Sequence, residues 1–234
     1  MAAKKKNKDL SVYILLDRSG SMSGSKWEHA IGSINSYTHQ LKKEGTVDAK
    51  ITVASFDSSS SALHNSFMNS LNQVSYKGSL YAAGPTLSFV VHREEANLDS
   101  YKDIDFNEIS PRGMTPLYDA TARLINMADQ KNSDKTVIII MTDGEENSSA
   151  HYNLVSIKDR INTCMTRGWE VIFMGAEFNA DRTASSYGLP NTKVVNSPVR
   201  NFTATMNAFA TSSAAYATTG LQFNTSELRT NEID

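Results

Sequence analysis

Short runs of large apolar residues alternate with amphipathic segments along most of the chain, and this alternation limits the possible folds more than any other feature. The runs are rich in valine and isoleucine and are bounded by polar residues, which is typical of buried strands. The expected strands are Val12–Leu16, Lys50–Phe56, Leu87–His92, Thr136–Met141, Val171–Ala176 and Lys193–Asn196.

Between these runs, apolar residues recur at helical spacing. The first such segment starts near Ser25, which could cap it, and ends at Gly45. Further helices are expected around Leu117–Ala128, Leu154–Cys164 and Phe202–Phe209. Strands that alternate with helices predict an α/β fold, here a mostly parallel sheet with helices on both faces.

The length of 234 residues, 40% of them hydrophobic, is enough for one domain with a full core. We expect this domain to span residues 10–219, after a basic tail over 1–9 and before a loosely held polar tail over 220–234. A polar stretch rich in serine and asparagine, at about 57–86, fits the alternation poorly. Its length predicts a functional loop or a partner-facing insertion.

Charge and composition argue against several classes of protein. The formal net charge of −2 gives no reason to expect binding to nucleic acid or to an anionic membrane. The single cysteine, Cys164, excludes an internal disulfide framework and a cysteine-based zinc site. No apolar run is long enough to span a membrane and no hydrophobic leader follows the first lysines, so the expected location is cytoplasmic.

The sequence DRSGSMSGS follows the first expected strand, and it could be a flexible polar loop, a phosphate-binding loop or a set of metal ligands. The glycines and the lysine after it do not match the phosphate-binding pattern G-x-x-x-x-G-K-[ST], and no G-x-S-x-G nucleophile motif is present. Asp17, Ser19 and Ser21 alternate along the chain, so in an extended segment their side chains point the same way. Three oxygens are part of the six-ligand shell that Mg²⁺ prefers.

Two other loops could supply further oxygens. Asp143 follows the strand Thr136–Met141, and Thr115 lies in the turn SPRGMTPLYDA ahead of a helix. In a parallel sheet with helices on both faces, sites form at the carboxyl ends of strands where the strand order reverses. Asp17 and Asp143 both occupy such positions.

Three motifs together resemble the von Willebrand factor A-type domain, called the I domain in integrins, with its metal-ion-dependent adhesion site. They are D-x-S-x-S at Asp17–Ser21, G-M-T-P-L-Y-D-A around Thr115, and T-D-G at Thr142–Gly144. Their order and spacing fit the family, and the match runs from about residue 10 to about residue 220. The resemblance implies a doubly wound, mostly parallel six-stranded sheet of the Rossmann-like kind, with one antiparallel edge strand expected at Leu87–His92. The stretch at about 57–86 departs from the family pattern.

The resemblance also implies roles for individual residues. Ser19, Ser21 and Thr115 would contact a metal directly or through one water, while Asp17 and Asp143 would act largely through water and by holding the hydroxyls. The strand that ends at Asp17 is expected beside the one that ends at Asp143. The expected metal is Mg²⁺, with Mn²⁺ or Ca²⁺ as possible substitutes.

Counting charges suggests a binding function. Two carboxylates neutralise a divalent ion only formally and the direct ligands are mostly neutral hydroxyls, so the ion keeps a position open for an outside oxygen. We expect a Glu or Asp carboxylate of a protein partner in that position, and no enzymatic activity. Arg18, Gly144 and Glu145 lie within or beside the motifs and are possible partner-facing or tuning residues.

Two alternatives remain open. A metal-dependent phosphohydrolase of the haloacid dehalogenase type also carries an Asp after its first strand, but here Ser19 stands where the second Asp, the acid/base, is expected. The metal site could instead be vestigial in a scaffold protein. Stand-alone domains that are similar in sequence pattern occur in bacteria and their viruses.

Overall fold

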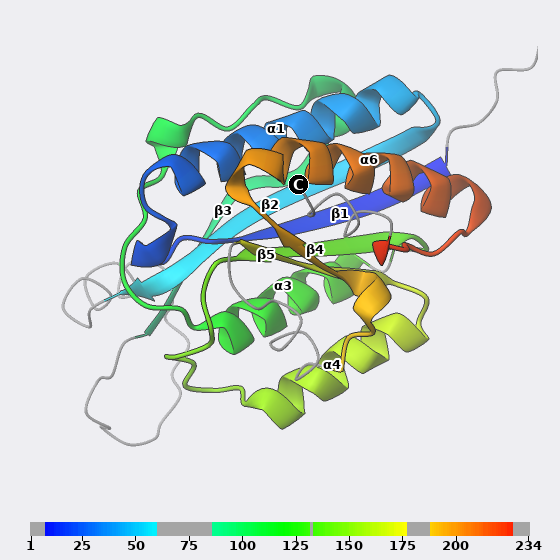
Figure 1. Cartoon of the computed structure of the whole chain (residues 1–234). Coiled ribbons are helices and arrows are strands. Elements are labelled where there is room, and N and C mark those ends of the chain that lie inside the picture. Colours follow the sequence, from blue (N-terminus) through cyan, green and yellow to red (C-terminus); the bar gives the residue numbers. More distant parts are fainter. Residues whose placement is uncertain (1–7, 60–85, 132, 177–187, 227–234) are drawn as a thin grey trace, which may run out of the picture.

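The computed structural model describes residues 8–59, 86–131, 133–176 and 188–226. In these ranges most strands alternate with helices, as expected, while β2 is followed by β3 (Figure 1). The strands are β1 (Lys8–Asp17), β2 (Val47–Ser59), β3 (Thr86–Asn97), β4 (Thr136–Thr142), β5 (Glu170–Ala176) and β6 (Val194–Ser197). The longer helices are α1 (Ser25–Glu44), α3 (Leu117–Lys131), α4 (Leu154–Thr166) and α6 (Phe202–Thr219).

The strands form one sheet in the order β3-β2-β1-β4-β5-β6. All neighbouring pairs are parallel except β2 and β3, so the prediction of a mostly parallel sheet with an antiparallel edge strand is confirmed. β1 lies beside β4, with Leu16 opposite Met141, as expected. The chain order reverses between these two strands, so their loops leave toward opposite faces and a gap opens between them for a site.

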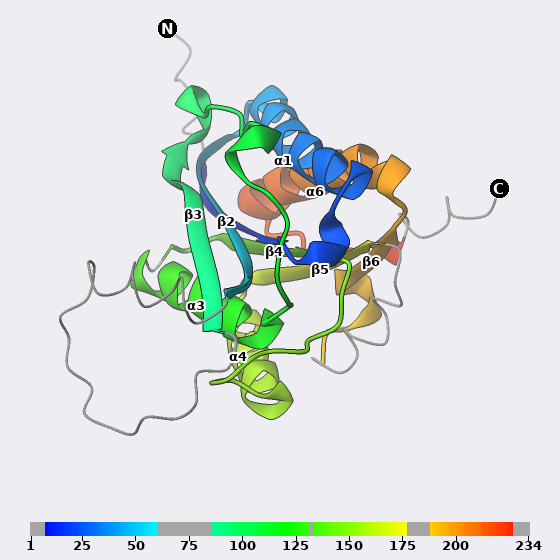
Figure 2. The same cartoon turned by 90° about the vertical axis from the view of Figure 1, so that its left-hand side faces the viewer.

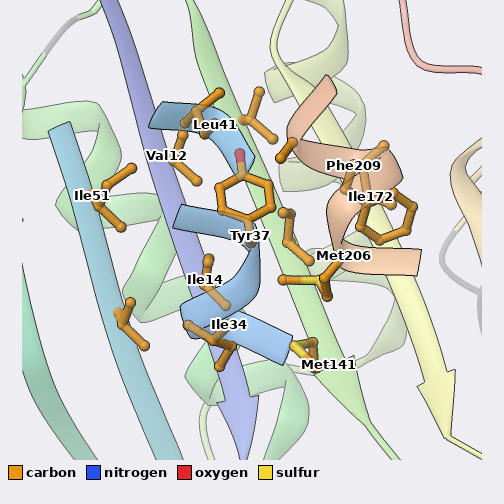
Figure 3. Close-up of a cluster of buried hydrophobic side chains, with 14 of the residues drawn as sticks. Val12, Ile14, Ile34, Tyr37, Leu41, Ile51, Met141, Ile172, Met206 and Phe209 are labelled. Atoms are coloured by element: carbon orange, nitrogen blue, oxygen red, sulfur yellow. The ribbon is translucent and has the colours of Figure 1, made fainter. Parts of the chain in front are cut away.

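Side chains of the central strands point alternately to the two faces of the sheet, and helices bury both faces. On one face, α1 and α6 cover Val12 and Ile14, which Figure 3 labels, and also Leu16. On the other face, α3 and α4 cover Tyr13 and Leu15. Figures 1 and 2 show these two helical layers with the sheet between them. The central strands are apolar throughout because neither face meets water.

The ends of α1 follow from local chain geometry. Gly45 follows its last residue with a φ of 61°, in the left-handed conformation that glycine adopts most easily. At the other end, Gly24 occupies the capping position and Ser25 is the first helical residue, so the expectation that Ser25 caps the helix is wrong. In the first two turns of α1, Trp27 and Ile31 are buried on the face that packs against the sheet.

The two expected tails differ from the structure at their inner ends. β1 begins at Lys8, within the expected basic tail. The segment 220–226 is packed rather than loosely held, because the side chain of Phe223 is 3% exposed. A buried ion pair between Glu170 and Lys193 fixes this segment, since Lys193 Nζ donates to the carbonyl of Phe223 at 3.0 Å.

The long polar stretch expected at about 57–86 is described only at its borders. Asp57–Ser59 extend β2 and Thr86 starts β3, while residues 60–85 lie outside the described residues. None of the helices in the described ranges has both the length and the apolar character needed to cross a membrane.

Candidate metal centre

Three loops meet at the carboxyl edge of the sheet, which faces the viewer in Figure 2. The first follows β1 and forms a short 3-10 turn (Gly20–Met22), the second leads into α3, and the third follows β4. The backbone N–H of Gly20 donates to the carbonyl of Gly113 at 3.2 Å, and that of Asn147 donates to the carbonyl of Thr115 at 3.2 Å. The structure therefore joins the three segments that carry the predicted site residues.

Hydrogen bonds connect the first loop to the third. Ser21 Oγ donates to Asp143 Oδ1 at 2.6 Å, and Ser19 Oγ lies 3.1 Å from Ser21 Oγ. Asp17 is fixed from two sides, because Thr142 Oγ1 donates to its Oδ2 at 2.5 Å and the backbone N–H of Ser19 donates to its Oδ1 at 2.7 Å. The two carboxylates and the two serine hydroxyls thus form one connected group of oxygens.

Thr115 from the second loop approaches the same group across Gly144. A methyl group placed on Gly144 would lie 3.4 Å from Thr115 Oγ1, 3.8 Å from Ser21 Oγ and 3.9 Å from Asp17 Oδ2. Oxygens from all three loops therefore surround a space that is open because residue 144 has no side chain. The five predicted ligands are brought together at this point.

Burial makes this group of oxygens receptive to a cation. The side chains of Asp17, Ser19, Thr115 and Asp143 are buried. The pKa of the Asp17 carboxyl is raised to about 6, mainly by burial and to a smaller extent by the neighbouring Asp143, although hydrogen bonds from Thr142 and Ser19 act to lower it. A buried carboxylate of this kind is stabilised by a positive charge at close range.

One positive charge is already present in the side chain of Lys26, at the start of α1. Its Nζ donates to Asp143 Oδ2 at 2.7 Å, and the side chain is 27% exposed. Asp143 therefore receives a serine hydroxyl on one oxygen and an ammonium group on the other.

The donor set fits a hard divalent cation. All its atoms are oxygens, and the two serine hydroxyls are 3.1 Å apart. Neighbouring ligands of an octahedral ion with bonds of about 2.1 Å are separated by about 3 Å. Among the described residues, no group of three or more His, Cys, Asp and Glu side chains is placed to hold a metal, so an ion here would also rely on hydroxyl oxygens.

The loop before α3 is fixed so that Thr115 faces this space. The Asn147 side chain accepts from the backbone N–H of Thr115 at 2.8 Å. Gly113 has a φ of 71°, and a Cβ on it would lie 2.2 Å from the carbonyl oxygen of Ser58, so only glycine fits. Met114 exchanges two hydrogen bonds with Ser58, through its N–H at 2.7 Å and its carbonyl at 3.0 Å.

Two carboxylates organise the loop after β4, and their role is not apparent from the sequence. Glu146 accepts from the backbone N–H groups of Tyr118, Ser148 and Ser149 at 2.9, 2.7 and 2.6 Å. Asp119 is buried and accepts from the N–H groups of residues 150, 151 and 152 at 2.9, 3.1 and 2.8 Å. The loop is therefore held to the first turn of α3 although it forms no helix or strand of its own.

Of the three candidate partner-facing or tuning residues, Arg18 is buried, with 6% of its surface exposed. Its Nη2 lies 3.0 Å from Asp57 Oδ1, so the expectation that it faces a partner disagrees with the structure. The exposed guanidinium belongs instead to Arg112, whose Nε lies 2.7 Å from Asp57 Oδ2. Gly144 lines the oxygen group and Glu145 is exposed beside it.

Neither a family model nor a curated protein sequence matches the chain. Solved structures match along most of its length. The vWF domain of the type V pili tip protein Mfa5 from Porphyromonas gingivalis aligns with a TM-score of 0.62 at 10% identity, over 92% of this chain and 98% of that chain. The pilus adhesin SpaC from Lactobacillus rhamnosus GG, in its open conformation, aligns with a TM-score of 0.62 at 12% identity, over 91% and 31%.

A third match is the proximal thread matrix protein 1 of the mussel byssus, with a TM-score of 0.53 at 11% identity over 89% of this chain and 47% of that chain. The chain thus spans nearly all of the Mfa5 domain but less than half of SpaC and of the mussel protein. The sheet order and the two helical layers define a doubly wound α/β domain with its loops gathered at one edge. More narrowly, this is the von Willebrand factor A-type fold, as the three motifs predicted.

Proposed function

We propose that the chain is a non-enzymatic module that binds a protein partner through a divalent cation, Mg²⁺ by preference. The observation that carries the proposal is the convergence of oxygens from three loops around Gly144. Proteins with the same fold include a pilus tip protein and a pilus adhesin, which supports a role in protein interaction.

Ser19, Ser21 and Thr115 would hold the ion directly or through one water. Asp17 and Asp143 supply negative charge and keep the hydroxyls in place, since Asp143 already accepts from Ser21 at 2.6 Å. When bound, the ion supplies an electrophilic position for one further oxygen ligand. A Glu or Asp carboxylate of a partner is the ligand best suited to a hard cation at a partly neutralised site.

A hydrolytic function is less well supported by the side chains present. In the phosphohydrolase alternative an acid/base carboxylate is needed two residues after Asp17. Ser19 stands there, and its hydroxyl lies 3.1 Å from another neutral hydroxyl, that of Ser21. The arrangement therefore favours holding a cation over transferring a proton.

Isothermal titration of Mg²⁺ tests the metal site directly. We expect binding by the unaltered chain, at least about tenfold weaker binding by Ser21→Ala, and none by Asp17→Ala. Ser23→Ala is the matched control, because Ser23 is exposed and its hydroxyl donates only to the carbonyl of Gly20, at 2.8 Å. Equal Mg²⁺ binding by all four proteins would rule out this site.

Recovery of partners from a lysate, with and without EDTA, tests the link between metal and partner. A partner captured through the ion is lost in EDTA and is lost with the Ser19→Ala/Ser21→Ala double variant. If the site is vestigial, the same proteins are recovered under all of these conditions. Unfolding curves of each variant show whether a loss of capture reflects a loss of fold.

A further inference from the structure

An exposed arginine and an exposed methionine flank the candidate metal centre. Arg112 and Met114 precede Thr115 in the same loop, and the side chain of Arg112 is 55% exposed. Met114 is 44% exposed and belongs to a small set of exposed large apolar residues in the described part of the chain. A cationic group and an apolar group therefore lie on the loop that also carries Thr115, one of the proposed metal ligands.

The side chain of Arg112 is held by the buried carboxylate of Asp57. Its Nε lies 2.7 Å from Asp57 Oδ2, and the other oxygen of this fully buried carboxylate binds Arg18 at 3.0 Å. Two guanidinium groups share one carboxylate, so the cluster keeps a net positive charge. Among the described residues, no hydrogen-bond acceptor occupies the two terminal nitrogens of Arg112. Its outer donors are thus available in a fixed orientation.

The backbone that carries these residues is fixed on two sides. The N–H of Arg112 donates to the carbonyl of Arg18 at 2.8 Å, and the carbonyl of Gly113 accepts from Gly20 at 3.2 Å. On the other side, Met114 exchanges two hydrogen bonds with Ser58. A surface held in this way pays little ordering cost when a partner binds.

We propose that Arg112 and Met114 form one docking surface with the metal centre, and that its occupant is a protein segment with two acidic side chains and an apolar one. The inference rests on the proposed function and specifies the partner. One carboxylate completes the shell of the ion, and the second accepts two hydrogen bonds from the outer nitrogens of Arg112. The apolar side chain packs against the flexible thioether of Met114. Charge complementarity selects this occupant, because the loop that would help to hold a cation through Thr115 also carries Arg112 of the net positive arginine cluster.

Random peptides displayed on phage provide the test. They are selected on the full chain in Mg²⁺ and released with EDTA. We expect the released peptides to share two acidic residues close to an apolar residue. Peptides selected on Arg112→Gln should share only one of the two acidic residues. Peptides selected on Met114→Ser should no longer share the apolar residue. Lys43→Gln removes an exposed positive charge near the far end of α1 and is expected to give the unaltered consensus.

A synthetic peptide with the selected sequence allows the effect to be measured by fluorescence anisotropy. We expect Arg112→Gln to weaken binding at least about tenfold and Arg112→Lys to weaken it less, because lysine keeps the charge but loses the planar fork. The same consensus from the unaltered chain and from Arg112→Gln would overturn this inference and leave the proposed function standing. A lack of any EDTA-released peptide would overturn both. If the chain instead associates with itself in Mg²⁺ and Arg112→Gln abolishes this association, the occupant is a second copy of the chain. That result would overturn the proposal that a segment of another protein binds here.

Discussion

Lys26 Nζ lies 2.7 Å from Asp143 Oδ2, so an ammonium group contacts one of the carboxylates proposed to hold the metal. The lysine is the second residue of α1, and Asp143 directly follows β4. The contact joins elements that are far apart in the sequence. A divalent ion bound here would therefore interact with a carboxylate, that of Asp143, which already forms an ion pair with Lys26.

Replacing Lys26 by glutamine is therefore expected to strengthen Mg²⁺ binding. An ion pair that is partly exposed contributes about 1 kcal/mol or less, which corresponds to a gain in affinity of up to about five-fold. Isothermal titration measures the change, with Lys43→Gln as a control for the loss of one positive charge elsewhere on α1. Weaker binding by Lys26→Gln would show instead that the lysine supports the site.

Gly144→Ala is expected to separate the metal site from the fold. The nearest atom to the added methyl group is Thr115 Oγ1 at 3.4 Å, an ordinary contact distance, so we expect the free energy of unfolding to change by less than about 1 kcal/mol. The same methyl group would occupy the space between the three loops, and we expect Mg²⁺ affinity to fall at least about tenfold. Urea unfolding and isothermal titration measure the two quantities. Normal Mg²⁺ binding by this variant would show that the ion does not sit among these oxygens.

The contribution of His92 to stability is expected to be lost between about pH 6.5 and about pH 4, whereas Asp17, whose pKa is raised to about 6, contributes with the opposite sign in the same range. Burial lowers the pKa of its imidazole to about 4, and the charge of Arg18 contributes. In the unfolded chain, His92 takes up a proton near pH 6.5, so its contribution to stability is present above that pH and is lost as the pH falls toward 4. The side chain is partly exposed, and we expect an effect of about 1–2 kcal/mol.

Urea unfolding of the unaltered chain and of His92→Gln, at about pH 7 and about pH 4.5, measures this contribution. Glutamine carries no charge at either pH and can still reach the hydroxyl of Ser55, which lies 2.7 Å from His92 Nε2. Asp17 is the same in both proteins, so the difference between them isolates His92, and the unaltered chain should be the less stable of the two at acid pH relative to its stability at neutral pH. An equal change of stability in both proteins would show that His92 makes no such contribution.

The segment after α6 is expected to contribute to global stability. Phe223→Ala removes a side chain that is 3% exposed and should lower the free energy of unfolding by about 3 kcal/mol. Leu221→Ala is the matched control, because Leu221 lies two residues earlier and is 67% exposed, and its replacement should cost less than about 0.5 kcal/mol. Urea unfolding distinguishes the two variants. Equal stability of both would mean that the segment adds nothing to the core.

The sheet could be predicted from the sequence because its central strands are buried on both faces. A run such as Thr136–Met141 has no polar side chain between its ends, which leaves little choice but a central strand. The site could be located for a related reason. Asp17 and Asp143 directly follow such runs, and neighbouring parallel strands bring their carboxyl ends to the same edge.

The contacts that support the site could not be predicted in the same way. Arg18 appears exposed in the sequence because it lies in a polar loop, and its partner Asp57 is 39 positions away on another strand. Glu146 resembles a solvated residue, yet its carboxylate accepts backbone N–H groups whose direction depends on the folded loop. Phe223 lies among polar residues and close to a second apolar residue, Leu221, and the sequence does not show which of the two is buried.

Asp57 has no exposed surface, yet it determines how Arg112 is presented to the outside. A partner would never touch this carboxylate. The preference of the domain for one partner over another can therefore shift during evolution through a substitution that no inspection of the binding face would reveal. Two related chains with identical exposed residues in this loop could differ in specificity if one of them lacks the aspartate beneath it.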